Sequence, residues 1–148
     1  MEDKKQRAYS SLESQCAKRE YCTADIYKKA LDRLEGDSAA AEEIVARLVE
    51  GGFVSDLRYA GAFAREKAAL TGWGPVKIRF ALSAKHISRE VIDEALREID
   101  SEKADDRLRH LLEAKRHLLE GDPQIRLKLI KFALSRGYDY DTVKKFVD

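Results

Sequence analysis

One pattern recurs three times along this chain of 148 residues, and it restricts the possible folds more than any other feature of the sequence. Each copy contains two apolar residues four positions apart, a tight turn, a third apolar residue and then an acidic residue. The copies read Ile44-x3-Leu48-x4-Phe53-x2-Asp56, Ile78-x3-Leu82-x4-Ile87-x2-Glu90 and Ile130-x3-Leu134-x3-Tyr138-x2-Asp141. This spacing is typical of a helix end, a turn whose apolar residue packs back on that helix, and an acid at the next helix start.

The reversing position of each turn is expected to take a left-handed backbone conformation, which costs glycine least. Gly52 and Gly137 occupy that position in the first and third copies, whereas His86 occupies it in the second. A histidine there implies either a strained left-handed residue or a different turn. The hexapeptides IRFALS at 78–83 and IKFALS at 130–135 align the second copy with the third.

Helix-forming residues dominate the rest of the sequence, and no alternating apolar run is long enough to indicate a strand. Both prolines are placed where helices are expected to begin, because proline is tolerated at the first helical position. Pro75 follows a glycine, and Pro123 follows Asp122, a good N-cap residue. Nine helices are predicted, over residues 9–19, 23–34, 39–50, 57–71, 75–84, 88–99, 102–119, 123–136 and 140–147.

Repeats of this kind cannot bury their apolar faces alone and must stack on one another. The sequence therefore predicts an all-α fold, an elongated array of three tandem three-helix repeats. The expected divisions are a flexible N-terminus at 1–7 and repeats at 8–54, 55–99 and 100–148. A globular bundle with coincidental similarity between its turns is the alternative.

The formal net charge of +1 conceals strong charge blocks. The net charge is +2 over residues 1–34, −5 over 35–57, +6 over 58–89, −6 over 90–106 and +4 over 107–148. Blocks like these steer association with charged partners, although solvated helix faces explain them equally well. No apolar stretch is long enough to span a membrane, and no secretory signal is visible. Together with two cysteines and no sign of export, this favours a cytoplasmic protein with free thiols.

Basic side chains recur at similar places in two predicted helices and could form a track along stacked repeats. The candidate partner-binding residues are Lys77, Arg79, Lys85, Arg126, Lys128, Lys131 and Arg136, with Arg58 and Tyr59 as weaker candidates. A nucleic-acid backbone or an acidic groove on a protein filament would fit such a track.

No motif places a nucleophile beside a base, so the chain is not expected to be an enzyme or to need a cofactor. His110, Glu113 and His117 share one helix face, but a metal site would need ligands from a second element. No metal is therefore expected. Cys16 is interpreted as a small core residue, and Cys22 is expected to be exposed.

Four segments resemble the RecX family of bacterial regulatory proteins, and together they cover almost all of residues 8–147. They are REYCTADIYKKAL (19–31), LVEGGFVSDLRYA (48–60), GWGPVKIRFALSAKHIS (72–88) and IKFALSRGYDYDTV (130–143). The patterns G-F-V-S-D-x-R-Y-A and G-x-G-P-x-K-I-R-x-x-L are the most specific. The sequence departs from the family at His86, where glycine is usual, and at Cys22 or Thr23, where a serine tends to open the helix.

The resemblance implies three tandem three-helix repeats and binding to the RecA recombinase filament on single-stranded DNA. It also implies that this binding restrains the ATPase, strand-exchange and coprotease activities of RecA. The main alternative is a helical DNA-binding module that acts through its basic face without RecA, and a generic protein adaptor is a weaker one. Direct DNA contact is expected to be weak in the first case, and the chain is expected to be a monomer.

Overall fold

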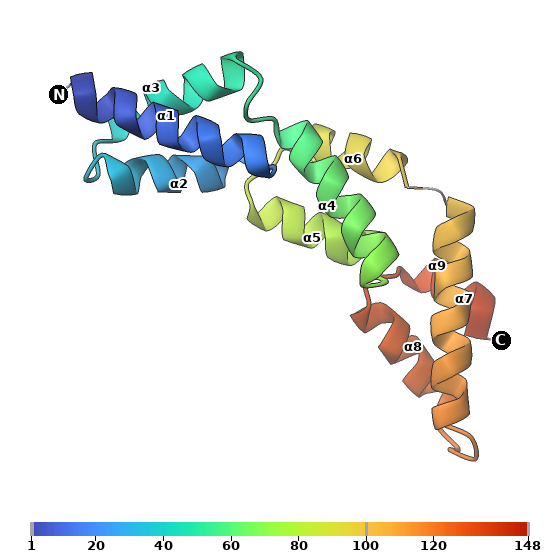
Figure 1. Cartoon of the computed structure of the whole chain (residues 1–148). Coiled ribbons are helices and arrows are strands. Elements are labelled where there is room, and N and C mark those ends of the chain that lie inside the picture. The colour runs from blue at the N-terminus through green and yellow to red at the C-terminus, as the bar shows by residue number, and fades with distance from the viewer. Residues whose placement is uncertain (1, 100, 148) are drawn as a thin grey trace.

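The computed structural model describes residues 2–99 and 101–147. Across these residues the chain forms nine α-helices and no strand, arranged as an elongated, bent array (Figure 1). The helices are α1 (Glu2–Lys18), α2 (Thr23–Arg33), α3 (Ser38–Glu50), α4 (Asp56–Leu70), α5 (Pro75–Ala84), α6 (Arg89–Arg97), α7 (Ser101–Leu118), α8 (Ile125–Ser135) and α9 (Tyr140–Val147). The predicted all-α helical array is confirmed. None of the described helices has the length and apolar character that crossing a bilayer requires.

The helices form three groups, each with an apolar core of its own. We call α1–α3 the first repeat, α4–α6 the second and α7–α9 the third. Leu12 and Leu48 are fully buried in the first core, Leu82 in the second and Leu108 in the third. In each of the main helix pairs, such as α2 with α3, α4 with α6 and α8 with α9, both helices belong to the same repeat. The repeats therefore touch mainly through their turns and helix ends.

The three predicted turns share one hydrogen-bonding pattern, that of a Schellman motif. The reversing residues Gly52, His86 and Gly137 have φ values of 78°, 60° and 96°. In each turn the following residue donates its N–H to a carbonyl five positions back, at 2.9 to 3.4 Å. His86 is thus a left-handed residue in the same turn as the two glycines, which decides between the two alternatives left by the sequence.

These turns also show that the hexapeptide alignment is wrong by one position. The carbonyl that accepts the long turn bond belongs to Leu48 in the first repeat, Leu82 in the second and Ala133 in the third. Ala133, and not Leu134, is therefore the counterpart of Leu82. The core uses Leu129 and Ala133 together with the expected Ile130, whereas the expected Leu134 is left 43% exposed.

Helix starts agree with the sequence where a side chain caps them. Ser55 and Ser88 accept hydrogen bonds from backbone N–H groups three residues later, as N-caps do. The Asp122 prediction was wrong, because its carboxylate accepts the Gln124 N–H at 2.8 Å in a preceding turn and α8 begins only at Ile125.

The first helix begins earlier than predicted. Residues 2–7, expected to be a flexible segment, form the first turns of α1. Two surface ion pairs accompany this extension, since Lys4 lies 2.7 Å from Glu35 and Lys5 lies 2.9 Å from Glu43. They tie the start of α1 to the rest of the first repeat.

Backbone groups join the second repeat to the third. Gly74 donates its N–H to the Arg136 carbonyl at 2.7 Å, and Val76 donates to the Gly137 carbonyl at 2.8 Å. A Cβ at Gly137 would overlap the Lys77 side chain and lie 2.8 Å from the Lys77 backbone nitrogen. The Gly-Trp-Gly-Pro elbow before α5 is therefore docked tightly on the α8–α9 turn.

Side chains join the first repeat to the second. Asp56, at the start of α4, accepts the backbone N–H of Thr23 at 2.7 Å. Lys85, after α5, forms an ion pair with Asp25 of α2 at 3.0 Å. Cys22, expected to be exposed, is fully buried because it packs in the core of the second repeat. The two junctions thus differ, because the first includes an ion pair between charged side chains, whereas the second rests mainly on backbone hydrogen bonds.

Candidate partner-binding surface

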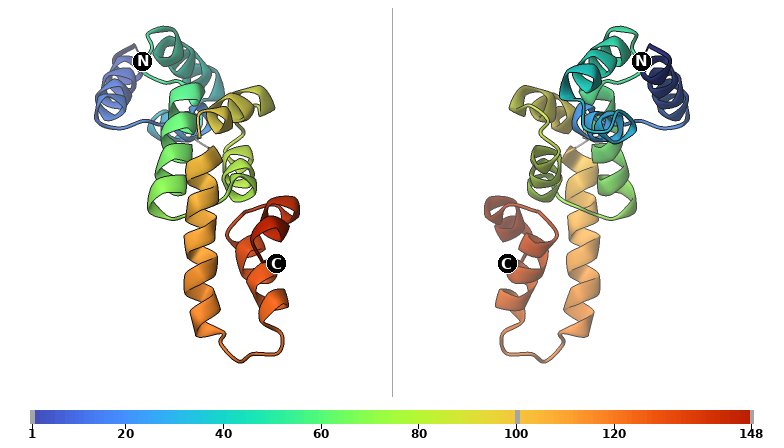
Figure 2. Two further views of the ribbon diagram at one scale, coloured as in Figure 1. Left: turned by 90° about the vertical axis from the view of Figure 1, so that its right-hand side faces the viewer. Right: turned by 90° about the vertical axis from the view of Figure 1, so that its left-hand side faces the viewer.

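The second helix of each repeat follows the inner edge of the bend. In Figure 1, α2, α5 and α8 occupy the lower left side of the array, and in Figure 2, α5 and α8 again lie one above the other. The tight contact between Gly74 and Gly137 brings the start of α5 to the end of α8. Most of the predicted contact residues lie on these two helices or in the turns that follow them, so the junction brings these segments together.

Four of the nine predicted contact residues are held in ion pairs inside the chain. The pairs, with N–O distances of 2.5 to 3.0 Å, are Arg58–Glu20, Arg79–Asp93, Lys85–Asp25 and Lys128–Asp122. Arg58 also donates to the Gly52 carbonyl at 2.8 Å, across the turn before α4. These cations have intramolecular partners that a binding partner would have to replace.

The same pairing reduces the effect of the +6 block. Of its seven cations, Arg58, Arg79 and Lys85 are paired as above, and Arg65 lies 3.3 Å from Glu98. All four acidic partners belong to segments outside the block. Counting charges along the sequence therefore overstates the positive charge that this surface offers to a partner.

Three of the predicted contact residues form no ion pair in the described part of the chain: Lys77, Lys131 and Arg136. The Lys77 ammonium lies 4.6 Å from the centre of the Trp73 ring, and the Arg136 guanidinium lies 5.2 Å from the centre of the Phe132 ring. Lys131 is exposed on α8. Cation–π contacts orient a cation without neutralising it, so these three residues stay available to an anionic group.

The sequence analysis missed two further cations at the same rings. Lys67 of α4 also faces Trp73, at 4.9 Å, and Lys115 of α7 faces Phe132, at 5.1 Å. Each ring therefore attracts two cations from different helices. The spacing along the sequence gave no signal for these contacts, because Phe132 and Lys115 meet only when α7 packs on α8.

The two remaining candidates have different environments. Tyr59 stacks on Phe63, with 6.0 Å between the ring centres, and burial raises the pKa of its hydroxyl. This tyrosine is half-buried against the second core and therefore supports the fold of its repeat. Arg126 is exposed near the start of α8.

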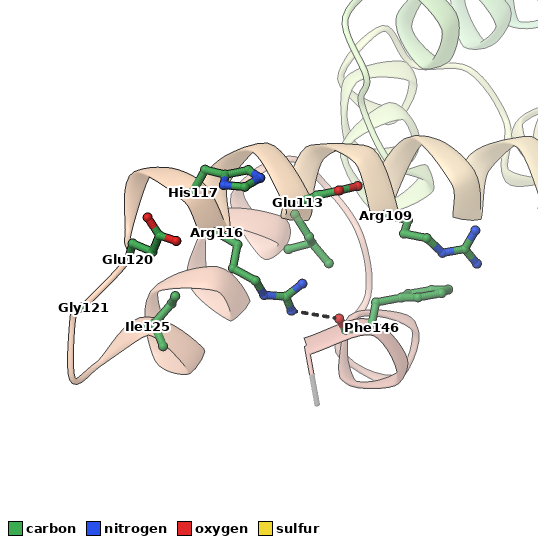
Figure 3. A pocket seen from close by; sticks show the side chains of 9 residues that line it. Arg109, Glu113, Arg116, His117, Glu120, Gly121, Ile125 and Phe146 are labelled. Carbon is green, nitrogen blue, oxygen red and sulfur yellow. Dashed lines mark hydrogen bonds between the residues drawn. The ribbon is translucent and has the colours of Figure 1, made fainter.

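A pocket of about 490 Å³ lies in the third repeat, between α7, the start of α8 and α9. Arg116 reaches across it and donates to the Phe146 carbonyl at 3.3 Å, with Glu113 and His117 on the α7 side (Figure 3). Within the described residues, no three metal-binding side chains come close enough to hold an ion. The face predicted for His110, Glu113 and His117 therefore acquires no additional ligand from a neighbouring helix.

Comparison with known proteins places this geometry in a family. The family model for the second three-helix domain of RecX matches residues 55–96. Regulatory protein RecX of Chlorobium phaeobacteroides strain BS1 is 31% identical over 134 residues, which cover 88% of this chain and 84% of the relative. The chain belongs to the RecX family. Regulatory protein RecX of Clostridium botulinum strain Alaska E43 is 36% identical over 115 residues, and this chain spans only 53% of its length.

Solved RecX structures share the architecture. A crystal structure of regulatory protein RecX superposes with a TM-score of 0.86 at 22% identity, covering 97% of this chain and 71% of the other. RecX from Lactobacillus salivarius gives a TM-score of 0.83 at 18% identity, covering 99% and 96%. At these identities the likeness concerns the fold, an array of helical repeats.

Proposed function

We propose that this protein binds the filament that RecA recombinase forms on single-stranded DNA and restrains its ATP hydrolysis, strand exchange and coprotease activity. Membership of the RecX family carries the proposal, because the sequence resemblance implies that partner. The elongated array supports it, since a long molecule can touch more than one subunit of a filament. Several modest contacts then add up through their high effective concentration.

The proposed mechanism needs no chemical step in this chain. A protein that binds one state of a filament more tightly than another holds the filament in that state. Contacts that bridge neighbouring RecA subunits would slow the changes that accompany ATP turnover. The protein is proposed to act as a cytoplasmic monomer.

The nine candidates, eight cations and one tyrosine, differ in what they offer to a filament. Lys77, Lys131 and Arg136 are the leading contact residues, because they have no ion pair in the described chain. Arg58, Arg79, Lys85 and Lys128 would first have to exchange an internal acidic partner for an external one. We therefore rank them below the three unpaired cations.

A triple charge reversal tests this surface. The variant Lys77→Glu/Lys131→Glu/Arg136→Glu should inhibit DNA-dependent ATP hydrolysis by the cognate RecA at least tenfold less well than the parent protein. A control with the same change in charge, Lys18→Glu/Lys144→Glu/Lys145→Glu, lies outside α5 and α8 and should stay within twofold. Unchanged inhibition by the folded test variant would reject the surface.

The alternative is a DNA-binding module that acts without RecA. Two cations, Lys67 and Lys77, lie over the Trp73 ring and support this alternative. Titration of labelled single-stranded and duplex DNA at two salt concentrations separates the two functions. Tight, steeply salt-dependent binding in the absence of RecA would favour the alternative. Retention on RecA only when DNA and ATP allow filaments to form would favour the filament modulator.

A further inference from the structure

Exposed apolar side chains lie on α5 and α8, the two helices that also carry Lys77 and Lys131. Phe80 of α5 is 78% exposed, and Val76, one turn earlier, is about half exposed. On α8, Leu127 and Leu134 are also about half exposed, with Lys131 between them. We define Val76, Phe80, Leu127 and Leu134 as the apolar row.

Helix geometry explains why these residues point outward. Phe80 is two positions from both Ile78 and Leu82, which are fully buried, so it projects from nearly the opposite side of α5. On α8, Leu127, Lys131 and Leu134 are spaced by four and three residues and share one stripe. In the correspondence set by the turns, Leu127 is the counterpart of Val76 and Leu134 that of Ser83, and both of these positions are exposed in the second repeat.

We propose that the apolar row is the anchor for a surface of the partner protein that carries both apolar and acidic side chains. The inference rests on the proposed function and makes that partner a RecA subunit in the filament. Charge complementarity argues for acidic groups, because Lys131 lies on the stripe of Leu127 and Leu134, Lys77 follows Val76 on α5, and neither cation has an ion pair in the described chain. Buried apolar anchors with a polar surround are the usual energetic centre of a protein interface.

The chemistry of the row argues for protein and against nucleic acid. Three of its four members are aliphatic, and aliphatic side chains lack the ring faces on which bases stack. Interfaces with nucleic acids are also more polar than those with proteins.

Two double variants test the row: Val76→Ser/Phe80→Ser and Leu127→Ser/Leu134→Ser. Each should weaken binding to RecA filaments at least tenfold, including at high salt, where ionic contacts are screened. The control Leu118→Ser removes a leucine at the end of α7 that is 80% exposed, about as much as Phe80. This control should bind within twofold of the parent protein. Circular dichroism and thermal unfolding confirm that each variant is folded.

The outcomes separate the two proposals. If the parent protein binds filaments and both folded double variants bind within twofold of it, the row is not the anchor while the proposed function stands. If the variants instead lose binding to naked single-stranded DNA in parallel, the row serves nucleic acid and the inference is overturned. If the parent protein does not bind RecA filaments at all, the proposed function fails and this inference fails with it.

Discussion

His86 has a φ of 60° at a position where the other two turns use Gly52 and Gly137. An L-residue in the left-handed region is crowded by its own Cβ, which costs roughly 1–2 kcal/mol. Glycine avoids that cost but loses more chain entropy on folding, which offsets part of the gain. The second turn therefore keeps the same geometry at a lower stability than the other two.

Replacing this histidine tests the size of that strain. His86→Gly should raise the free energy of unfolding by about 0.5–1 kcal/mol, as measured by urea denaturation. The reverse change, Gly52→Ala, should lower it by about 1 kcal/mol. A Cβ at Gly52 would meet nothing within 4 Å, so this loss would report backbone strain alone. A loss of stability in His86→Gly would mean that its imidazole contributes more than the turn costs.

At the scale of elements, the docking of the α4–α5 elbow on the α8–α9 turn controls how the second and third repeats meet. Two backbone hydrogen bonds and the Tyr138 hydroxyl, which donates to the Gly72 carbonyl at 3.2 Å, hold these segments together. Gly74 and Gly137 allow the approach because neither has a Cβ. These hydrogen bonds restrain the elbow.

Gly137→Ala should therefore do more than strain its own turn. The added methyl would collide with Lys77, so we expect a loss of about 2–3 kcal/mol in unfolding free energy, beyond the roughly 1 kcal/mol of Gly52→Ala. Small-angle scattering should also show a changed angle between the repeats. Equal losses in the two variants, with unchanged scattering, would mean that the junction yields without cost.

For the whole molecule, the ion pair in the first junction predicts that the stability contributed by this junction depends on pH. Burial alone would raise the pKa of Asp25, but the hydrogen bond and charge of Lys85 lower it below its ordinary value of 3.8. The hydrogen bond from Asp25 raises the pKa of Lys85 above 10.5, against a smaller opposing effect of burial. A lowered carboxyl pKa stabilises the fold above pH 3.8 and loses that effect as the pH falls further. A raised ammonium pKa stabilises it below pH 10.5 and loses that effect as the pH rises.

NMR titration of the Asp25 carboxyl checks this contact. Lys85→Met should raise its pKa above the value in the parent protein, because burial then acts without an opposing cation. Lys128→Met removes a comparable ion pair within the third repeat and should leave Asp25 unchanged. If Asp25 titrates at the same pH in all three proteins, Lys85 does not govern it, and the first junction has another basis.

The sequence by itself determined the helices, the three reversing turns and the stacking of repeats into an array. These features depend on signals within about ten residues, such as Ser55 as a cap or Gly52 in a turn, and local signals survive in a single sequence. The family resemblance likewise rests on short contiguous segments.

The tertiary structure alone decided which side chains are free to bind. Lys85 and Asp25 are 60 residues apart in the sequence, and Arg58 and Glu20 are 38 apart. Their pairing follows from how the repeats dock, which no local pattern encodes. The same holds for the burial of Cys22 by a neighbouring repeat and for the shift that exposes Leu134. Cations available to a partner are those that remain after such long-range contacts form, so Lys77, Lys131 and Arg136 could be singled out as proposed contacts only in the folded chain.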